Sequence, residues 1–356
     1  MDGCPSHSGH ARYSPKMRYI IIGAGAVGGS IGGRLAEAGH DVVLVARGAH
    51  LTALREHGLR LLTPDGDLQL PIPAVAGPEE LGELRPDDVL ILCVKSQDTA
   101  AVLQQWAGLP VAGGAGTAAE LIPVVCAQNG VENERVALRL FENVYGLCVW
   151  LPSLHLEPGV VAAHCAPQSG ILTVGRYPDG IDDRIKQIGH DLAESRFDAP
   201  VVDDVMRWKY GKLLNNLGNA FEAVADLSAD EELAERLVDT AQDEGRRALN
   251  AAGIPFVGPG ERRAVQADRM DFAEIPGTPR GGGSSWQSLA RGAGSIETDY
   301  LSGEIVLVGR THGVPTPVNA LMQRLSAQFA AEGRAPGSMG LGELAELVAR
   351  VQKTEG

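Results

Sequence analysis

Residues 18–47, RYIIIGAGAVGGSIGGRLAEAGHDVVLVAR, decide the fold of this chain. Residues 19–22 are aromatic or β-branched, which suits a strand buried on both faces. The sequence Gly-x-Gly-x-x-Gly follows at once and begins a helix, and the apolar strand DVVLV comes after that helix. A glycine motif in this order of strand, turn, helix and strand indicates an α/β unit that binds a dinucleotide.

The residues of this motif have separate physical roles. Gly23 permits the tight turn, Gly25 lets the backbone approach a pyrophosphate, and Gly28 lets the helix pack closely on the sheet. The first turn of the helix, from Ala26 and Val27, presents free N–H groups and the positive end of the helix dipole. We therefore expect these five residues to bind the cofactor.

The residue at the end of the second strand indicates which dinucleotide binds. NAD enzymes usually carry Asp or Glu there, to bind the ribose 2′-hydroxyl. This chain has Arg47, and no carboxylate lies between Asp41 and Glu56. Because a guanidinium fork matches phosphate oxygens, Arg47 favours the 2′-phosphate of NADP. The alternative is a solvated loop residue.

Composition excludes several classes of function. A net charge of −14 argues against nucleic-acid and membrane-surface partners. The five cysteines form no C-x-x-C pair, which fits a reducing cytoplasm. No apolar run approaches the ~18–20 residues of a membrane span. The nine histidines show no metal-ligand spacing, so we expect no metal.

The 356 residues are long enough for two domains. We expect a disordered tail over 1–16, an NADP-binding Rossmann-type domain over 17–202, a helical substrate and catalytic domain over 203–332, and a C-terminal extension over 333–356. In the first domain apolar strands alternate with helices, which favours a parallel sheet covered on both faces. Residues 159–176 are expected to add further strands, as a hairpin across the sheet edge.

Helical spacing dominates the second domain. It extends over 203–226, 229–252, 284–301 and 317–331, and the run at 304–308 fits a strand or a helix. No other apolar strand is expected there. The loop at 275–284 is rich in glycine and proline, and the sequence leaves open whether it acts as a lid.

Two polar residues directly follow apolar strands of the first domain. Lys95 comes after VLILCV, and Asn129 comes shortly after LIPVVCA. In an open parallel sheet, ligands bind outside the carboxyl ends of the strands. We therefore expect both residues on the same edge as the glycine turn, near the cofactor and the substrate. The alternatives are a surface lysine and an ordinary Asn-Gly turn.

A polar stripe marks the first helix of the second domain. Lys212, Asn216 and Asn219 are spaced at i, i+4 and i+7, and therefore share one narrow sector. Asparagine is a poor helix former, and a solvated face would more cheaply use Glu, Lys or Gln. A lysine beside amides suits a site that binds a carbonyl or carboxylate and donates a proton. The alternative is an amphipathic helix with a solvated face.

Taken together, these segments resemble the ketopantoate reductase (2-dehydropantoate 2-reductase) family from about residue 17 to about 325. The segments that carry the resemblance are GAGAVGG, CVKSQ, AQNGVEN, KLLNN and SIETDYLSGEIVLVGRTHGVPTPVN. The last is the most specific, with matches at Glu297, Asp299-Tyr300, Ser302-Gly303 and Thr316-Pro317.

The resemblance implies an α/β Rossmann-type N-terminal domain and an all-α C-terminal domain like that of 6-phosphogluconate dehydrogenase. It implies reduction of ketopantoate to pantoate with NADPH, in pantothenate and coenzyme A biosynthesis, with the substrate between the domains. Lys212 would be the catalytic lysine, and Asn216 its neighbouring asparagine. A 2-oxo acid is the expected partner, and a homodimer is left open.

Further roles follow from the resemblance. Lys95 and Asn129 would match the family's strand-end residues, and Ser285 and Glu297 have the family's serine–glutamate spacing at the substrate. Glu297 could bind the substrate hydroxyl and hold Lys212 in place. On composition alone, Glu297 would be an ordinary exposed helix residue.

The chain departs from the family pattern at several points. Asn219 stands one residue before the position of the family's second helix asparagine, which is Ala220 here. Lys209 competes with Lys212 as proton donor. Within SSWQSLARG, Ser288 replaces an acidic residue. Two other functions therefore stay open: a D-2-hydroxyacid dehydrogenase acting on another branched 2-oxo acid, and a non-catalytic NADP sensor.

Overall fold

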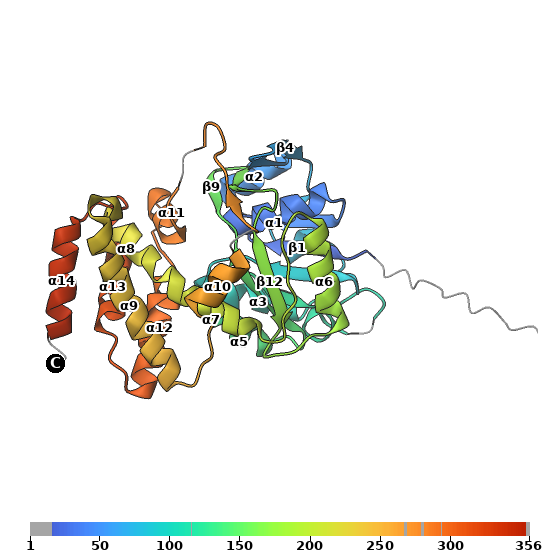
Figure 1. Cartoon of the computed structure of the whole chain (residues 1–356). Coiled ribbons are helices and arrows are strands. Elements are labelled where there is room, and N and C mark those ends of the chain that lie inside the picture. The colour runs from blue at the N-terminus through green and yellow to red at the C-terminus, as the bar shows by residue number, and fades with distance from the viewer. Residues whose placement is uncertain (1–15, 115, 267–268, 279–280, 293, 354–356) are drawn as a thin grey trace, which may run out of the picture.

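The computed structural model describes residues 16–114, 116–266, 269–278, 281–292 and 294–353. Figure 1 shows an α/β lobe and a helical lobe side by side, with α7 and α10 where the two meet. The expected tail over 1–16 lies outside the described residues except for Lys16. Met17 is buried, at 4% exposure, so the packed core of the described chain includes this residue.

A seven-stranded sheet forms the centre of the α/β lobe, in the order β12-β8-β7-β6-β1-β2-β5. All pairings are parallel except that of the edge strand β12 with β8. The chain order reverses between β1 and β6, which makes their carboxyl ends the natural binding crevice. The strands are β1 (Arg18–Ile22), β2 (Asp41–Val45), β5 (Ala74–Val75), β6 (Asp88–Leu92), β7 (Val124–Cys126), β8 (Val144–Trp150) and β12 (Ile171–Arg176).

Helices cover both faces of this sheet, as the sequence predicts. Tyr19 and Ile21 of β1 pack in the core that includes α1 and α6, whereas Ile20 and Ile22 pack in the core that includes α3 and α5. This alternation explains why β1 is apolar throughout. The helices are α1 (Ala26–Glu37), α2 (Gly48–His57), α3 (Thr99–Ala107), α4 (Ala118–Leu121), α5 (Asn133–Leu138) and α6 (Asp183–Glu194).

The segment 159–176 differs from the expected hairpin. Its first strand joins a separate sheet of order β4-β3-β10-β9, and only β12 extends the main sheet. Between them, β11 (Cys165–Ala166) pairs with β13 (Asp271–Phe272) of the later chain. The strands of the small sheet are β3 (Leu59–Thr63), β4 (Gly66–Leu70), β9 (Ser153–Glu157) and β10 (Val160–Ala163).

The second lobe is helical, and the run at 304–308 lies in a helix. The C-terminal extension belongs to this lobe, because α14 buries Leu344 and Val348 in its core. None of the helices in the described part of the chain has the length and apolarity that a membrane crossing requires. The helices are α7 (Val205–Asn216), α8 (Gly218–Val224), α9 (Glu231–Ala251), α10 (Pro259–Gln266), α11 (Ser284–Ala290), α12 (Ser302–His312), α13 (Pro317–Glu332) and α14 (Leu341–Lys353).

Several helix predictions for this lobe are wrong in detail. The helix expected over 203–226 is divided at Leu217, next to Gly218 and two asparagines, which are poor helix formers. The helix expected over 284–301 ends at Ala290, because Gly292 and Gly294 adopt φ values of 61° and 66°. After them only the 3₁₀ turn η4 (Thr298–Tyr300) forms. Helix α10 and strand β13 were not expected.

The helical lobe is fastened to the α/β lobe by the segment around β13. The N–H of Ala273 donates to the carbonyl of His164 at 2.8 Å, and Arg269 pairs with Asp198 at 2.9 Å. Together with β13 on β11, these contacts hold one wall of the junction between the lobes.

Candidate active site

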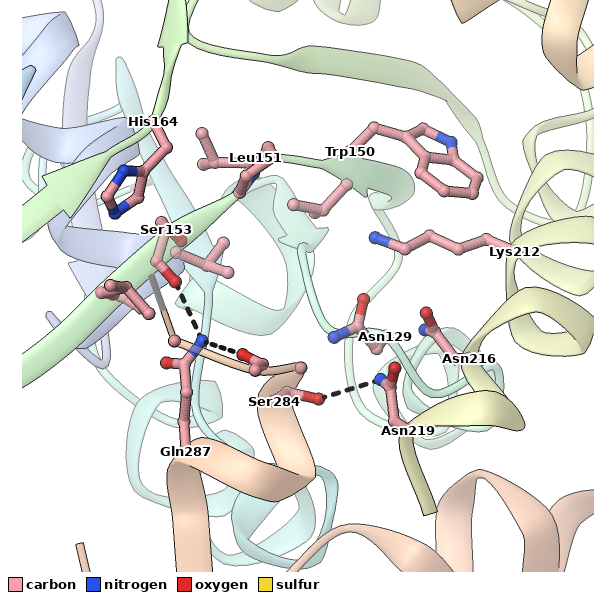
Figure 2. Close-up of a pocket in the computed structure, with 18 of the residues that line it drawn as sticks. Asn129, Trp150, Leu151, Ser153, His164, Lys212, Asn216, Asn219, Ser284 and Gln287 are labelled. Atoms are coloured by element: carbon pink, nitrogen blue, oxygen red, sulfur yellow. Dashed lines mark hydrogen bonds between the residues drawn. The ribbon is translucent and has the colours of Figure 1, made fainter. Parts of the chain in front are cut away.

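A cavity of about 430 Å³ lies at the junction of the lobes, beside the carboxyl ends of the parallel strands. Figure 2 shows Lys212 reaching into it, with Trp150 on one side and Asn129 and Asn216 on the other. The first turn of α1 contributes Ala26 and Val27. Further wall segments come from residues 149–154 and 281–284.

Lys212 lies on α7 and turns its ammonium group toward the indole of Trp150, 4.8 Å from the ring centroid. No described residue hydrogen-bonds to this ammonium group. Burial lowers the pKa of Lys212 to about 8, and the nearby Lys209 ammonium contributes to the lowering. A lysine of this pKa is largely protonated at neutral pH and gives up its proton readily.

Amide groups surround this ammonium group. Asn216 is 6% exposed, and its Nδ2 has no hydrogen-bond partner among the described residues. The Oδ1 of Asn129 is likewise buried and unpaired. Asn219 donates through Nδ2 to Ser284 Oγ at 3.4 Å. Because unpaired buried polar atoms are costly, these groups point to a polar ligand in the cavity.

The competing lysine has a different environment. Lys209 is 2% exposed and forms an ion pair with Glu134, which is fully buried. Its Nζ also lies 3.4 Å from the carbonyl oxygen of Cys126. Lys209 does not line the cavity, whereas Lys212 does. The spacing of three residues along α7 turns the two lysines to different neighbours.

The glycine turn fits a dinucleotide. A methyl group placed at Gly25 would meet a single described neighbour, His155 Nδ1, at 3.9 Å, so the backbone there is open to a ligand. Gly23 has a φ of 101°. No side chain caps the N-terminus of α1, so its first N–H groups stay available for phosphate oxygens. These residues would hold the pyrophosphate of a nicotinamide cofactor.

The other residues expected at the cofactor lie outside the cavity, on the same sheet edge. Arg47 occupies the N-cap position of α2. Its side chain is 87% exposed and forms an ion pair with Asp98 at 3.1 Å. Lys95 follows β6, and its Nζ donates to the carbonyl of Ser295 at 2.8 Å. Burial lowers the pKa of Lys95.

Glu297 is not where the sequence places it. Its Oε1 accepts hydrogen bonds from the N–H and hydroxyl of Ser96, at 2.8 and 3.0 Å, and it does not line the cavity. These donors bind the carboxylate, so the expected contact with Lys212 is absent from the described structure. Ser285 is buried, and its neighbour Ser284 lines the cavity instead. In the described structure Glu297 thus connects the residues next to η4 to the loop after β6.

Sequence reasoning missed several wall residues. Trp150 ends β8, Gln287 donates to the carbonyl of Ser153 at 3.2 Å, and Glu222 follows Asn219 by three residues on α8. Glu222 continues the polar stripe, so a longer helical projection of the same segment would have included it.

A Rossmann-type domain whose open glycine turn faces a lysine and several amides defines a nicotinamide-dependent oxidoreductase. The family model described as ketopantoate reductase PanE/ApbA matches residues 19–179, and the model of its C-terminal part matches residues 204–330. The chain belongs to the ketopantoate reductase family. It is thus an oxidoreductase related to enzymes that reduce 2-dehydropantoate.

Individual relatives agree with this assignment. A 2-dehydropantoate 2-reductase of Halobacterium salinarum is 30% identical over 313 residues, covering 85% of this chain and 95% of that protein. One of Pyrococcus abyssi is 26% identical over 328 residues, covering 89% and 100%.

Solved structures agree with the fold. A PanE/ApbA family ketopantoate reductase from Ralstonia eutropha superposes with a TM-score of 0.72 at 28% identity, covering 89% of this chain and 99% of that chain. A D-mandelate dehydrogenase with bound NADH and anilino(oxo)acetate also gives 0.72, at 22% identity, covering 90% and 100%. At that identity the second likeness supports the fold alone.

Proposed function

We propose that the protein reduces ketopantoate to pantoate with NADPH, and that Lys212 supplies the proton. The observation that carries the proposal is the position of Lys212, which faces the cavity beside Ala26 and Val27 of the glycine-turn helix. Asn129, Asn216 and Asn219 offer donors and acceptors for the carboxylate and the 2-oxo group.

The proposed reaction uses these residues in a simple order. Bound NADPH supplies the hydride that reaches C2 of the substrate. As C2 accepts it, negative charge develops on the carbonyl oxygen, and the Lys212 ammonium stabilises this charge. Lys212 then transfers its proton to that oxygen, which gives the hydroxyl of pantoate. The neutral amine regains a proton from water. Glu297 and Lys95 hold the two lobes together around the cofactor edge.

The preference for NADPH over NADH belongs to the same proposal. It is supported by Arg47, two residues after the end of β2, with an exposed guanidinium in a stretch without a carboxylate. An ion pair between an exposed guanidinium and a partly exposed aspartate is weak in water, so Arg47 can exchange Asp98 for a phosphate.

Steady-state oxidation of NADPH with a panel of 2-oxo acids tests the function. We expect ketopantoate to give the highest kcat/KM. If 2-oxoisovalerate is turned over equally well, the specific substrate assignment is wrong. The apolar wall of Trp150, Met270 and Phe272 supports a second candidate, a D-2-hydroxyacid dehydrogenase for a bulkier 2-oxo acid. In that case an aromatic 2-oxo acid would give the higher value.

A further inference from the structure

The cavity holds a second full charge besides Lys212, at the wall segment that contains Gly283. Of the described residues that line the cavity, Lys212 and Glu222 are the ones that are charged at neutral pH. Ten residues separate their backbone positions on α7 and α8, and the Glu222 carboxylate lies at the cavity wall beside Gly283. Asn216 and Asn219 lie between them on the same stripe.

The Glu222 carboxylate is fixed through one oxygen and open at the other. Its Oε2 accepts a hydrogen bond from the N–H of Gly283 at 2.7 Å. No described residue donates to Oε1. A methyl group at Gly282 would lie 2.8 Å from Oε1, and one at Gly283 would lie 2.9 Å from Oε2. The glycines before α11 thus leave room for this carboxylate at the cavity.

The two charges orient any 2-oxo acid that binds. Its carboxylate and its developing oxyanion are attracted by Lys212 and repelled by Glu222. The opposite end of the substrate then faces Glu222, whose free oxygen can only accept a hydrogen bond. A carboxylate without a donor loses hydration without compensation, so it disfavours a substrate with an apolar end.

We propose that Glu222 is a specificity-determining residue that selects 2-oxo acids with a hydroxyl group at the end remote from the carboxylate. This inference rests on the proposed function, because it assumes a 2-oxo acid in this cavity. It deepens that function by assigning recognition of the distal hydroxyl to α8. The asparagine of the family pattern is absent at Ala220, so the helix stripe ends at Asn219 and Glu222 instead.

A matched pair of substrates tests the proposal. 3,3-Dimethyl-2-oxobutanoate differs from ketopantoate only in lacking the 4-hydroxyl. We expect Glu222→Ala to lower kcat/KM for ketopantoate by about 10- to 100-fold while leaving the deoxy substrate unchanged or improved. In Glu222→Gln the single amide oxygen replaces only one of the two accepting oxygens, so the preference for ketopantoate should fall, but by less than in Glu222→Ala. Glu235→Ala, an exposed change on α9, is the control.

The contrary outcome is equally clear. If Glu222 serves only to fix Gly283, Glu222→Ala lowers kcat/KM for both substrates by the same factor, and the proposal is overturned. Equal turnover of both substrates by the unaltered enzyme also overturns it, while leaving a reductase of 2-oxo acids in place.

A binding measurement separates this proposal from the proposed function. Calorimetry with the enzyme and NADP compares pantoate with 2-hydroxy-3,3-dimethylbutanoate. If ketopantoate is not reduced but pantoate binds selectively, and Glu222→Ala removes the selectivity, the reaction is wrong and the recognition stands. Binding without selectivity overturns the recognition even if the enzyme is active.

Discussion

Lys212 and Lys209 lie three residues apart on α7, yet their surroundings give them different tasks. Lys209 is buried against Glu134, so its charge is neutralised inside the fold. Lys212 faces the cavity and lacks an acidic partner among the described residues. The i, i+4, i+7 spacing predicted the second arrangement, whereas the partner of Lys209 lies 75 residues away and no local pattern reveals it.

The two lysines should therefore fail in different ways when replaced. We expect Lys212→Ala to lower kcat at least ~100-fold, because a general acid is lost, with little change in stability. Lys209→Met leaves the charge of Glu134 buried without its partner and should cost about 3–5 kcal/mol of unfolding free energy. Steady-state rate assays measure the change in kcat, and urea unfolding measures the change in stability. An unchanged rate in Lys212→Ala would move the proton donor to Lys209 or Lys95.

The lowered pKa of Lys212 predicts a pH dependence with a definite sign. Ketone reduction needs the protonated ammonium, so kcat/KM should fall as pH rises through about 8, the pKa to which burial lowers Lys212. The reverse oxidation of pantoate needs the neutral amine and should rise over the same interval. Initial rates in both directions between pH 6 and 10 measure this. If the Lys212→Arg enzyme showed the same fall of kcat/KM near pH 8, the assignment would be contradicted.

Arg47 predicts a difference between the two nicotinamide cofactors. Arg47→Ala should raise KM for NADPH by about 10-fold or more and leave KM for NADH unchanged, because only NADPH carries the 2′-phosphate. Arg55→Ala, which removes an exposed charge from the same helix, serves as the control. Equal effects of Arg47→Ala on both cofactors would contradict the phosphate role.

At the scale of elements, the glycine turn works because helix α1 approaches the sheet more closely than side chains permit. A methyl group at Gly28 would lie 2.1 Å from the carbonyl oxygen of Gly23 and 3.0 Å from Cβ of Cys93. The first contact is shorter than atoms allow and the second is unusually tight, so the helix would have to move away from β1 and β6.

We expect Gly28→Ala to cost about 1–3 kcal/mol of stability and to weaken NADPH binding, because the helix N-terminus is displaced. Gly218→Ala is the matched control, since a methyl group there meets its nearest atom at 3.5 Å and favours helix. Thermal unfolding and calorimetric titration measure both variants. Normal NADPH affinity in Gly28→Ala would show that the close approach is not needed.

Sequence periodicity found the long elements and missed the short ones. Strand β1 is a continuous buried run, and helix α9 shows a clear helical period with buried residues on one face. Helix α10 has eight residues, and β13 has two residues that depend on pairing with β11. Such a pairing depends on tertiary contact and leaves no local signal.

At the scale of the whole molecule, contacts between distant segments join the lobes, and these lay beyond sequence reasoning. Glu297 and Ser96 are 201 residues apart, and the motif that identified Glu297 did not reveal its partner. Likewise Val131, after β7, packs in a core formed by helices α7, α9 and α12. The loop after β7 therefore contributes to the junction together with α7.

The same junction places Glu304 of α12 near Glu132. Burial, together with the Glu132 carboxylate, raises the pKa of Glu304 to about 7, and Arg135 opposes this shift. In the unfolded chain Glu304 has an ordinary pKa, so the native state favours its protonated form. Stability from this group is present at low pH and is lost as pH rises from about 4.5 to 7.

Replacing this carboxylate by an amide should therefore stabilise the junction at alkaline pH. We expect Glu304→Gln to raise the unfolding free energy by about 1–3 kcal/mol at pH 8 and to change little at pH 4.5, since the native carboxyl is already neutral there. Urea unfolding at the two pH values measures the difference, with the exposed Glu346→Gln of α14 as the control. A gain of equal size at both pH values would contradict the raised pKa, because a neutral carboxyl and an amide differ little in charge. The pH dependence of the stability gain thus shows whether the carboxylate of Glu304 is buried between the two lobes.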